Sequence, residues 1–470
     1  MSATATTEKK YLKWYQKLAY GSGDLASNCS YGLVSSFVLL YLTGTLGLDS
    51  AIIGSLMLAS KVLDGISDVI FGTLIDRTHS KLGKARPWML FGQVGVSLCL
   101  FLLFAIPAGS TTMQYIYFFI VYTALNAVFY TANGIAYSSL VALITKNNNE
   151  RVQLGSFRFM FAVVTNIFMG FAVTGMVEKF GSGAAGWRTT ALIFAIVGLV
   201  VNTISCLAVK ELPEEELGDN TSEAAEEGKA VAEEKKHGVA ETAKVLVHNK
   251  YYLMILAIYI VYYIMSNLTT GAGVFCATYY WGDGSLLGQF SMMKMFPVII
   301  ALAIAPVIIK KTGSMQKVNF WGYAISSVLG IPMIYFAMQK NLSMFLLFMF
   351  IKGIFAGTLS GSLNALIAEA SGYTTRTTGI HMDGMMYSCS SLGVKVGGGI
   401  GTAAVGWLLK LGGFVGTATV QSESAIRMIF NLYITFPFVI GIIITVLLAF
   451  LDVEKANKKW DAEHQKEAQA

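Results

Sequence analysis

The sequence has few charged residues for its length of 470. Asp, Glu, Lys and Arg make up 13% of it, about half of the roughly 25% found in soluble domains, while apolar residues reach 54%. This composition excludes a disordered chain and an ordinary water-soluble globular domain. The net charge of +6 does not indicate a nucleic-acid partner, because the 34 basic residues are scattered between hydrophobic stretches instead of forming one basic face.

Cysteine is also scarce, and its spacing matches neither a metal site nor a disulfide framework. The five cysteines lie singly inside apolar segments, so we expect reduced, buried thiols. The sequence lacks the His-Glu-x-x-His and Gly-x-Ser-x-Gly motifs of hydrolases, so we expect neither enzymatic activity nor a cofactor. The first 19 residues contain lysines but no apolar stretch ending in small residues, which predicts no cleavable signal peptide.

Long apolar runs dominate the rest of the chain. A membrane-spanning helix needs about 20 largely apolar residues, and twelve segments satisfy this requirement. Their approximate ranges are 20–43, 50–75, 87–106, 113–142, 153–177, 188–209, 250–276, 286–309, 317–338, 343–370, 379–410 and 426–451. The sequence therefore predicts an all-α membrane protein with twelve transmembrane helices in two pseudo-symmetric halves.

The segment 210–249 differs from everything around it. It is rich in acids and lysines and has no aromatic residue, which is typical of a solvated and largely disordered linker. It separates a six-helix amino-terminal half (1–209) from a six-helix carboxyl-terminal half (250–451), and a polar tail (452–470) follows. Most Lys and Arg residues fall in the termini, in this linker and in alternate connections. Both termini and the linker should thus be cytoplasmic, in a multi-pass plasma-membrane protein that we expect to be a monomer.

The two halves share a weak internal repeat. Asn28, Gly32 and Tyr41 in the first span recur at the same spacing as Asn267, Gly271 and Tyr280 in the seventh. Together with the arrangement of six spans, a linker and six spans, this repeat predicts two parallel halves that enclose a central cavity. Transporters built in this way hold their substrate near the middle of the membrane.

The second span contains three ionisable residues, which cost several kcal/mol in a membrane unless they are paired or face water. Lys61, Asp64 and Asp68 share one helical face with Ser67. The two carboxylates, one turn apart, repel each other. A bound monovalent cation, a shared proton or the ammonium group of Lys61 relieves that repulsion. A static salt bridge between two helices is the structural alternative.

A polar face is predicted on the first span, where Asp24, Asn28 and Tyr31 follow one another at helical spacing. A carboxylate accepts hydrogen bonds from sugar hydroxyls, and an amide offers both a donor and an acceptor. Capping of a helix start is the alternative role for Asp24. A second polar stretch lies in the fourth span, where Thr131, Asn133 and Tyr137 are the candidates for substrate or cation contacts.

Further basic residues lie within the predicted spans. Arg158 sits near the start of the fifth span, where it either contacts substrate or extends to the cytoplasmic surface. Lys395 lies deep in the eleventh span between glycines that let neighbouring helices approach, and it needs a carboxylate, a carbonyl or a substrate as its partner. The sequence does not identify partners for Lys294 and Lys352.

The loop between the second and third spans carries acid and base close to a glycine. Asp76, Arg77, Lys84 and Arg86 are predicted to form a charge clasp that gates the cytoplasmic side. Ordinary enrichment of basic residues in cytoplasmic loops is the alternative, and it explains the bases but not the acid.

These motifs together resemble the glycoside-pentoside-hexuronide:cation symporter family of the major facilitator superfamily, the relatives of melibiose permease. The resemblance covers the chain apart from the linker. Its most specific part is the paired-aspartate segment of the second span followed by Gly-Lys-x-Arg-Pro-Trp. It implies a coupling-cation site and sugar contacts nearby, with Lys395 close to both. The implied cation ligands are Asp64, Ser67, Asp68 and Thr131, and the implied sugar contacts are Asn28, Arg158 and the polar face of the fourth span.

The sequence departs from melibiose permease at several implied sugar contacts. Asn28 replaces an aspartate, Gly134 stands at a fourth-span aspartate position, and Ser138 stands at a tryptophan position. These changes argue against recognition of galactosides by the same groups. A stretch that opens the eleventh span also differs and contains His381, for which pH sensing is a conjecture.

The leading hypothesis is a symporter that couples entry of Na+ or H+ to uptake of a glycoside, pentoside or hexuronide by alternating access. A cation-coupled carrier of another substrate class, lysophospholipid, on the same fold is the alternative. It would need an apolar lining, whereas the predicted cavity is rich in Asn, Ser, Thr and Tyr. The sequence identifies neither the sugar nor the coupling ion.

Overall fold

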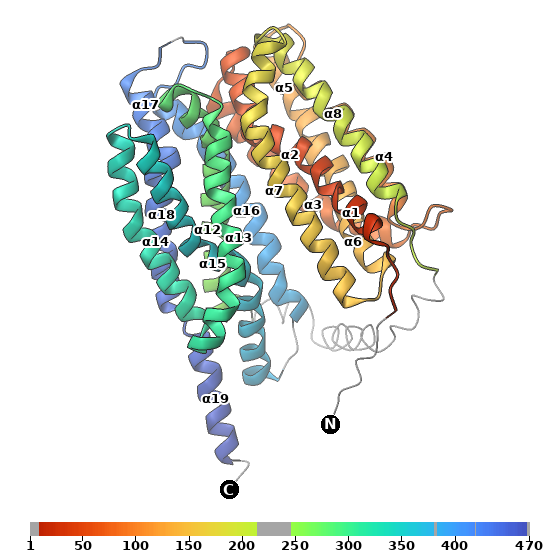
Figure 1. Cartoon of the computed structure of the whole chain (residues 1–470), viewed down its shortest axis with the longest axis vertical. Coiled ribbons are helices and arrows are strands. Elements are labelled where there is room, and N and C mark those ends of the chain that lie inside the picture. Colours follow the sequence, from red (N-terminus) through yellow and green to blue (C-terminus); the bar gives the residue numbers. More distant parts are fainter. Residues whose placement is uncertain (1–8, 214–245, 380–382, 419, 468–470) are drawn as a thin grey trace. The chain divides into compact units, whose positions relative to one another are not determined.

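The computed structural model describes residues 9–213, 246–379, 383–418 and 420–467, and every regular element in these ranges is helical (Figure 1). His381 and most of the predicted linker lie outside the described residues. Up to residue 213 the elements are α1 (Trp14–Gly21), α2 (Gly23–Leu40), η1 (Tyr41–Thr45), α3 (Ser50–Asp76), α4 (Arg86–Leu103), α5 (Thr111–Thr123), η2 (Ala124–Tyr130), α6 (Thr131–Ile144), α7 (Asn148–Lys179) and α8 (Gly183–Leu207). From residue 246 onward they are α12 (Lys250–Phe275), η3 (Cys276–Trp281), α13 (Leu286–Thr312), α14 (Met315–Met338), α15 (Leu342–Thr378), α16 (Asp383–Leu411), α17 (Glu423–Phe430), η4 (Asn431–Thr435), α18 (Phe436–Phe450) and α19 (Val453–Glu467).

The described elements confirm the prediction of twelve long helices. Eleven continuous helices are long and apolar enough to cross a membrane. The twelfth is α3, whose 27 residues extend about 40 Å, but which carries Lys61, Asp64 and Asp68. Most helices start or end within a few residues of the predicted bounds. The first begins earlier, at Trp14, and the predicted tail contains a further helix, α19.

The described residues include four short π-helical segments: η2 and η4 lie within continuous helices, and η1 and η3 end theirs. A π-helical turn contains one extra residue, so it rotates the side chains that follow and is common at functional sites. The segment η2 ends at Tyr130, immediately before Thr131, and therefore sets the direction in which Thr131 points.

The chain separates into two compact units. The first contains Met1–Asp219, Ala277–Gln289 and Gly406–Ile426, and the second contains Asn220–Cys276, Phe290–Val405 and Arg427–Ala470. Large apolar side chains are exposed on both, for example Val69 and Phe91 in the first and Val328 and Phe450 in the second. An apolar surface of this kind suits contact with lipid.

One hydrogen-bond arrangement occurs in both units. In the first unit Glu211, just after α8, accepts hydrogen bonds from the backbone amides at the start of α4. In the second, Glu454, just after α18, accepts a hydrogen bond of 2.9 Å from the amide of Gln316 at the start of α14. The repeated asparagines also agree, since Asn28 and Asn267 each donate to the carbonyl four residues earlier. The matching positions of Glu211 and Glu454 are consistent with the internal repeat, whereas the asparagine bond is also made by Asn126 and Asn166 and is not specific to it.

Candidate functional site

A carboxylate on the charged helix α3 anchors the first part of the site. The Asp64 side chain is only 13% exposed, and its Oδ2 lies 3.5 Å from the Nζ of Lys61, one turn earlier. A buried carboxylate with an ammonium group on one side keeps its charge at a lower cost than an isolated one. The ion pair is local to α3, so the predicted alternative of a static bridge between two helices does not describe Lys61.

The other oxygen of Asp64 faces α6. Thr131 Oγ1 lies 2.7 Å from Asp64 Oδ1 and 2.9 Å from the carbonyl oxygen of Asn126. A hydroxyl has one proton but two lone pairs. It can therefore donate to the carboxylate or to the carbonyl and still accept a further contact through its lone pairs. The π-helical segment η2 creates this geometry, because it brings Thr131 above Asn126, five residues earlier.

The two remaining members of the predicted cation site lie on the same helix. Ser67 donates a hydrogen bond of 2.9 Å to the carbonyl of Asp64, so its hydroxyl bonds the backbone and not the carboxylate. Asp68 is half-buried one turn beyond Asp64. Among the described residues, no group of three His, Cys, Asp or Glu side chains is placed to hold a metal ion. The oxygens present suit a proton or a monovalent cation better than a transition metal.

The second part of the site is an ion pair between α2 and α7. Arg158 Nε donates to Asp24 Oδ2 over 2.6 Å, and the two side chains are 25% and 18% exposed. The guanidinium group also lies over the ring of Tyr137, with its carbon 4.2 Å from the ring centre. The Tyr137 hydroxyl lies 3.4 Å from the same carboxylate oxygen and donates to the carbonyl of Tyr20 over 2.8 Å. Arg158 therefore points into the bundle and does not extend to the surface.

Two further predicted residues continue this polar face along α2. Asn166 on α7 donates to the side-chain oxygen of Asn28 over 2.9 Å. Tyr31 stacks on Tyr130, with the ring centres 5.8 Å apart. Because Tyr130 is the neighbour of Thr131, the polar face of α2 and the Asp64 site meet at two consecutive residues. Sequence analysis missed Asn166, because a single neutral amide in an apolar span gives no signal of charge.

Asn133 does not lie with these groups. Its side chain is buried between α6 and α4, where it donates to the carbonyl of Met89 over 3.2 Å and to the Gln93 side chain over 3.0 Å. Asn202 on α8 donates to the same carbonyl of Met89. Asn133 thus joins helices of the first unit, and the structure does not support the predicted substrate contact.

The loop between α3 and α4 is arranged differently from the predicted charge clasp. Asp76 and Arg77 are exposed at the end of α3, and Asp76 forms no ion pair within the described part of the chain. Arg86 is 9% exposed and donates to the carbonyl of Cys206 over 3.3 Å. The backbone amides of Lys84 and Arg86 bond the carboxylate of Glu211 over 2.7 and 3.0 Å.

Glu211 is the residue that the clasp prediction missed. A carboxylate at a helix start satisfies free amides and complements the helix dipole. The contact also explains the glycine in the loop. Gly83 has φ +113°, and a Cβ there would lie 2.3 Å from Glu211 Cδ, so only glycine suits this position.

Lys395 belongs to the second unit. It is half-buried on α16 between Gly393 and Gly397, which face α12. A Cβ on these glycines would lie 2.3 Å from Tyr259 Cβ and 2.4 Å from the carbonyl oxygen of Ile260. The predicted role of the glycines in close helix packing is therefore consistent with the structure.

Comparison with known proteins bears on the family and the fold of the chain. The family model described as MFS/sugar transport protein matches residues 19–455. The isoprimeverose transporter of Lactiplantibacillus pentosus is 26% identical over 98% of this chain and 93% of its own length. A putative glycoside/cation symporter of Escherichia coli (strain K12) is 24% identical over 94% of this chain and 92% of its own length.

Among solved structures, a bacterial homolog of the human lysosomal transporter Spinster superposes with a TM-score of 0.68. The match has 12% identity and covers 95% of this chain and 98% of that one. At this identity the likeness shows the fold alone, which is the twelve-helix fold predicted from the sequence. The resemblance to glycoside-pentoside-hexuronide:cation symporters is confirmed by the family model and the relatives together. The chain therefore belongs to the MFS/sugar transport protein family of membrane transporters.

Proposed function

We propose that this transporter is a symporter that couples entry of Na+ or H+ to uptake of a glycoside, pentoside or hexuronide by alternating access. The observation that carries the proposal is the Asp64 carboxylate inside a membrane helix, with Thr131 2.7 Å away and Lys61 3.5 Å away. Charged groups within membrane helices mark ion and substrate pathways. The relative that is named as a putative glycoside/cation symporter supports the same assignment.

The cation site in this proposal consists of Asp64, Asp68, Thr131 and Ser67. Asp64 supplies the charge and Thr131 a neutral oxygen, while Asp68 is the second carboxylate, whose repulsion the cation relieves. The bond from Ser67 to its own helix leaves one lone pair of its hydroxyl oxygen for the ion. Protonation of one carboxylate would relieve the repulsion equally well, so the geometry fits either Na+ or H+.

The sugar site in this proposal lies along α2 and α7. Asp24 accepts hydrogen bonds from sugar hydroxyls, Arg158 donates to them, and the rings of Tyr31 and Tyr137 offer flat apolar faces. Asn28 adds a donor and an acceptor. Lys395 remains a proposed contact from the second unit, and Asn133 is assigned to helix packing instead.

Coupling between the two sites follows from their junction at Tyr130 and Thr131. Cation binding reorients the Thr131 hydroxyl, and the preceding residue, Tyr130, stacks on Tyr31 of the sugar site. A cation that tightens sugar binding must itself be bound more tightly when sugar is present, by the same factor. We expect the cation to bind first, and only the empty and the fully loaded carrier to change state.

A lysophospholipid substrate fits these residues less well. The groups gathered around α2 are charged or hydrogen-bonding: a carboxylate, a guanidinium group, two amides and several phenols. Acyl chains would gain nothing from them, because burying such groups against hydrocarbon costs free energy.

Binding of a panel of neutral and acidic glycosides to the purified protein tests the proposal. Titrations with and without Na+ between pH 5.5 and 8.5 separate the coupling ions. Affinity that rises with Na+ identifies a sodium symporter, and affinity that follows pH alone identifies a proton symporter. If no glycoside binds under any of these conditions, the proposal is wrong.

The orientation and organisation of the chain complete the proposal. We propose that both termini and the 210–249 linker lie in the cytoplasm, that Asp76 and Arg77 take part in gating there, and that the carrier works as a monomer. Labelling of single cysteines introduced at positions 10 and 460 with an impermeant reagent tests the orientation. Labelling of intact cells at either position would contradict it.

A further inference from the structure

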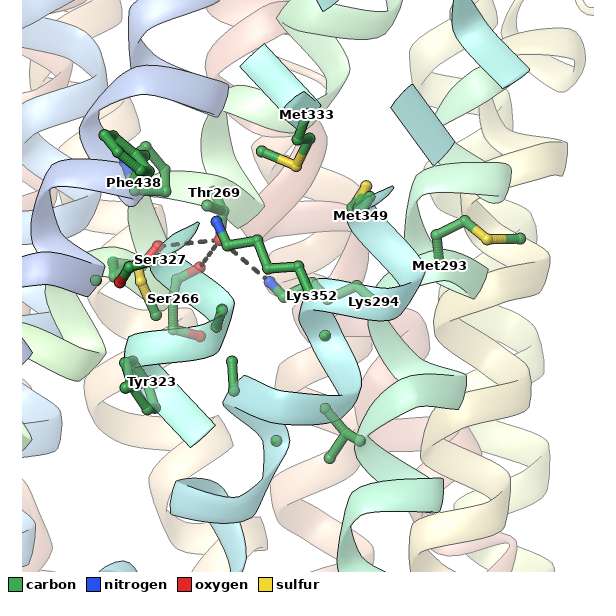
Figure 2. A pocket seen from close by; sticks show the side chains of 18 of the residues that line it. Ser266, Thr269, Met293, Lys294, Tyr323, Ser327, Met333, Met349, Lys352 and Phe438 are labelled. Carbon is green, nitrogen blue, oxygen red and sulfur yellow. Dashed lines mark hydrogen bonds between the residues drawn. The ribbon is translucent and has the colours of Figure 1, made fainter. Parts of the chain in front are cut away.

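The second unit contains a pocket with two lysines that the proposed symport does not use. Lys294 on α13 and Lys352 on α15 both line it, and Figure 2 shows the two side chains reaching toward Thr269 on α12. The cavity measures about 190 Å³ and is formed entirely by residues of the second unit. Apart from three tyrosines, its polar lining residues are Ser266, Thr269, Lys294, Ser326, Ser327 and Lys352.

Close packing of α13 and α15 brings the two lysines to one place. A Cβ on Gly353 would lie 2.8 Å from Pro297 Cβ, and a Cβ on Gly357 would lie 2.7 Å from Ala301 Cβ. Lys352 directly precedes Gly353, and Lys294 lies one turn before Pro297. The two helices therefore meet at the same level as the lysines, and glycine makes this approach possible.

Neither lysine has an acidic partner among the described residues. Lys294 Nζ donates only to hydroxyls, those of Thr269 over 3.2 Å and Thr270 over 3.3 Å. Lys352 makes no hydrogen bond or ion pair with any part of the chain that the structure describes. The acidic side chains described in the second unit bond other groups: Glu369 with Asn457, Asp452 with Lys250, Glu454 with Ser314, Asp461 with Arg376 and Glu463 with Lys459.

Two ammonium groups together in an apolar pocket are costly unless an anion joins them. Transfer of one charge into a membrane interior already costs several kcal/mol, and two like charges add mutual repulsion. The rest of the lining is largely apolar, including Met293, Met333 and Phe345, so it supplies no counter-charge. A bound anion removes both costs and gains two charge-assisted hydrogen bonds, which are the strong ones.

We propose that this pocket is a binding site for a carboxylate or sulfonate group, held between Lys294 and Lys352 with hydroxyls of α12 as further partners. The cavity is smaller than the roughly 300–1,000 Å³ of pockets that enclose a drug-sized ligand. It therefore suits a small acid or the acidic end of a larger molecule. The site does not depend on the cation site of the first unit, so it stands independently of the proposed symport.

Equilibrium dialysis of the purified full-length protein with labelled sodium glucuronate tests this site. Competition by sodium acetate, sodium methanesulfonate and neutral glucose separates the sources of the acidic group. Competition by acetate or methanesulfonate means that the pocket takes a free acid, and glucuronate binding that neither one displaces means that it needs the acid on a sugar. Glucose should not compete, and full displacement by glucose would overturn the proposal.

The variants Lys294→Met and Lys352→Met should each weaken glucuronate binding about tenfold or more, as expected for loss of a charged hydrogen bond. Lys311→Met is the matched control, because Lys311 is exposed at the other end of α13, and its affinity should equal that of the wild type. Thermal unfolding adds a second readout. Removing an uncompensated buried charge should leave the melting temperature unchanged or raise it, whereas lysines that only hold the helices together would lower it.

Three results would overturn the proposal: unchanged affinity in both lysine variants, equal loss of affinity in Lys311→Met, or no glucuronate binding to the wild type. Failure of the proposed symport has a different signature. Asp64→Asn should keep the glucuronate affinity of this pocket even where it abolishes cation-driven uptake. Loss of glucuronate binding in Asp64→Asn alone would place the ligand in the first unit instead.

Discussion

Asp64→Asn keeps the shape of the side chain and removes its charge. In the structure this carboxylate accepts the Thr131 hydroxyl over 2.7 Å and faces the Lys61 ammonium group over 3.5 Å. An amide can still accept the hydroxyl proton, but it offers the cation no charge. Coupled sites ordinarily change each other's affinity about 5–150-fold, and we expect this enhancement of glycoside binding by the cation to fall to about onefold in the variant.

The companion variant Thr131→Val removes one neutral ligand and leaves the charge. A hydrogen bond to a charged group is worth about 1.5–3 kcal/mol, which corresponds to a loss of roughly 10–150-fold in cation affinity. Because Asp64 remains, a sufficiently high cation concentration should restore coupling in Thr131→Val. No cation concentration should restore it in Asp64→Asn.

Proteoliposomes measure both effects with the glycoside that the binding panel identifies. Accumulation driven by a Na+ or pH gradient should be lost in Asp64→Asn, whereas exchange of labelled for unlabelled glycoside should persist. Asp461→Asn, on α19 outside the spans, is the matched control and should transport normally. Undiminished gradient-driven accumulation in Asp64→Asn would refute the reasoning, because Asp68 alone would then suffice for coupling.

Further variants probe the rest of the chain. Arg158→Lys keeps the charge but loses the planar contacts with Asp24 and the Tyr137 ring. Glycoside affinity should therefore fall about tenfold, while cation affinity stays constant. An equal loss of both affinities would contradict separate sites. Glu211→Ala leaves backbone amides at the start of α4 without a partner and should cost about 1–2 kcal/mol, seen as earlier thermal unfolding. Glu454→Ala should behave alike if the units are true repeats. Asp49 is partly buried, which opposes its ionisation, but hydrogen bonds from the Lys410 ammonium group and two backbone amides outweigh this and lower its pKa below 3.8. The ionised Asp49 side chain therefore contributes its full stabilisation above that pH and loses it only in stronger acid. Asp49→Asn should lower the melting temperature equally at pH 5.5 and 8.5. A lower melting temperature at pH 8.5 alone would contradict this assignment.

The fold was predictable because the membrane imposes a simple rule on the sequence. A spanning helix must satisfy its own backbone and be about 20 residues long, so counting apolar runs located the helices. The bounds of the second span, predicted at 50–75, agree closely with Ser50–Asp76. Domain bounds near 209 and 250 remain predictions, because the residues between 214 and 245 lie outside the described part of the chain.

The candidate site was only partly predictable, and the reason differs from residue to residue. Asp24, Arg158 and Asp64 gave a signal because charge is rare inside apolar helices. Asn133 was misplaced, because a helix in a bundle is apolar nearly all round and its sequence does not show which side faces a neighbour. Glu211 was missed because the predicted disordered linker gave no reason to single out one acid among many.

The charges on α3 also bear on how the protein is made. Lys61, Asp64 and Asp68 each raise the free energy of entry into the membrane by about 2.5–3.5 kcal/mol near a helix centre. Consistent with this, α3 is long enough to span but is absent from the eleven helices that qualify on composition. During synthesis α3 should not leave the translocon as a single helix. It should enter the membrane together with α4. The residues that permit transport would then also set the order in which the helices of the first unit are inserted.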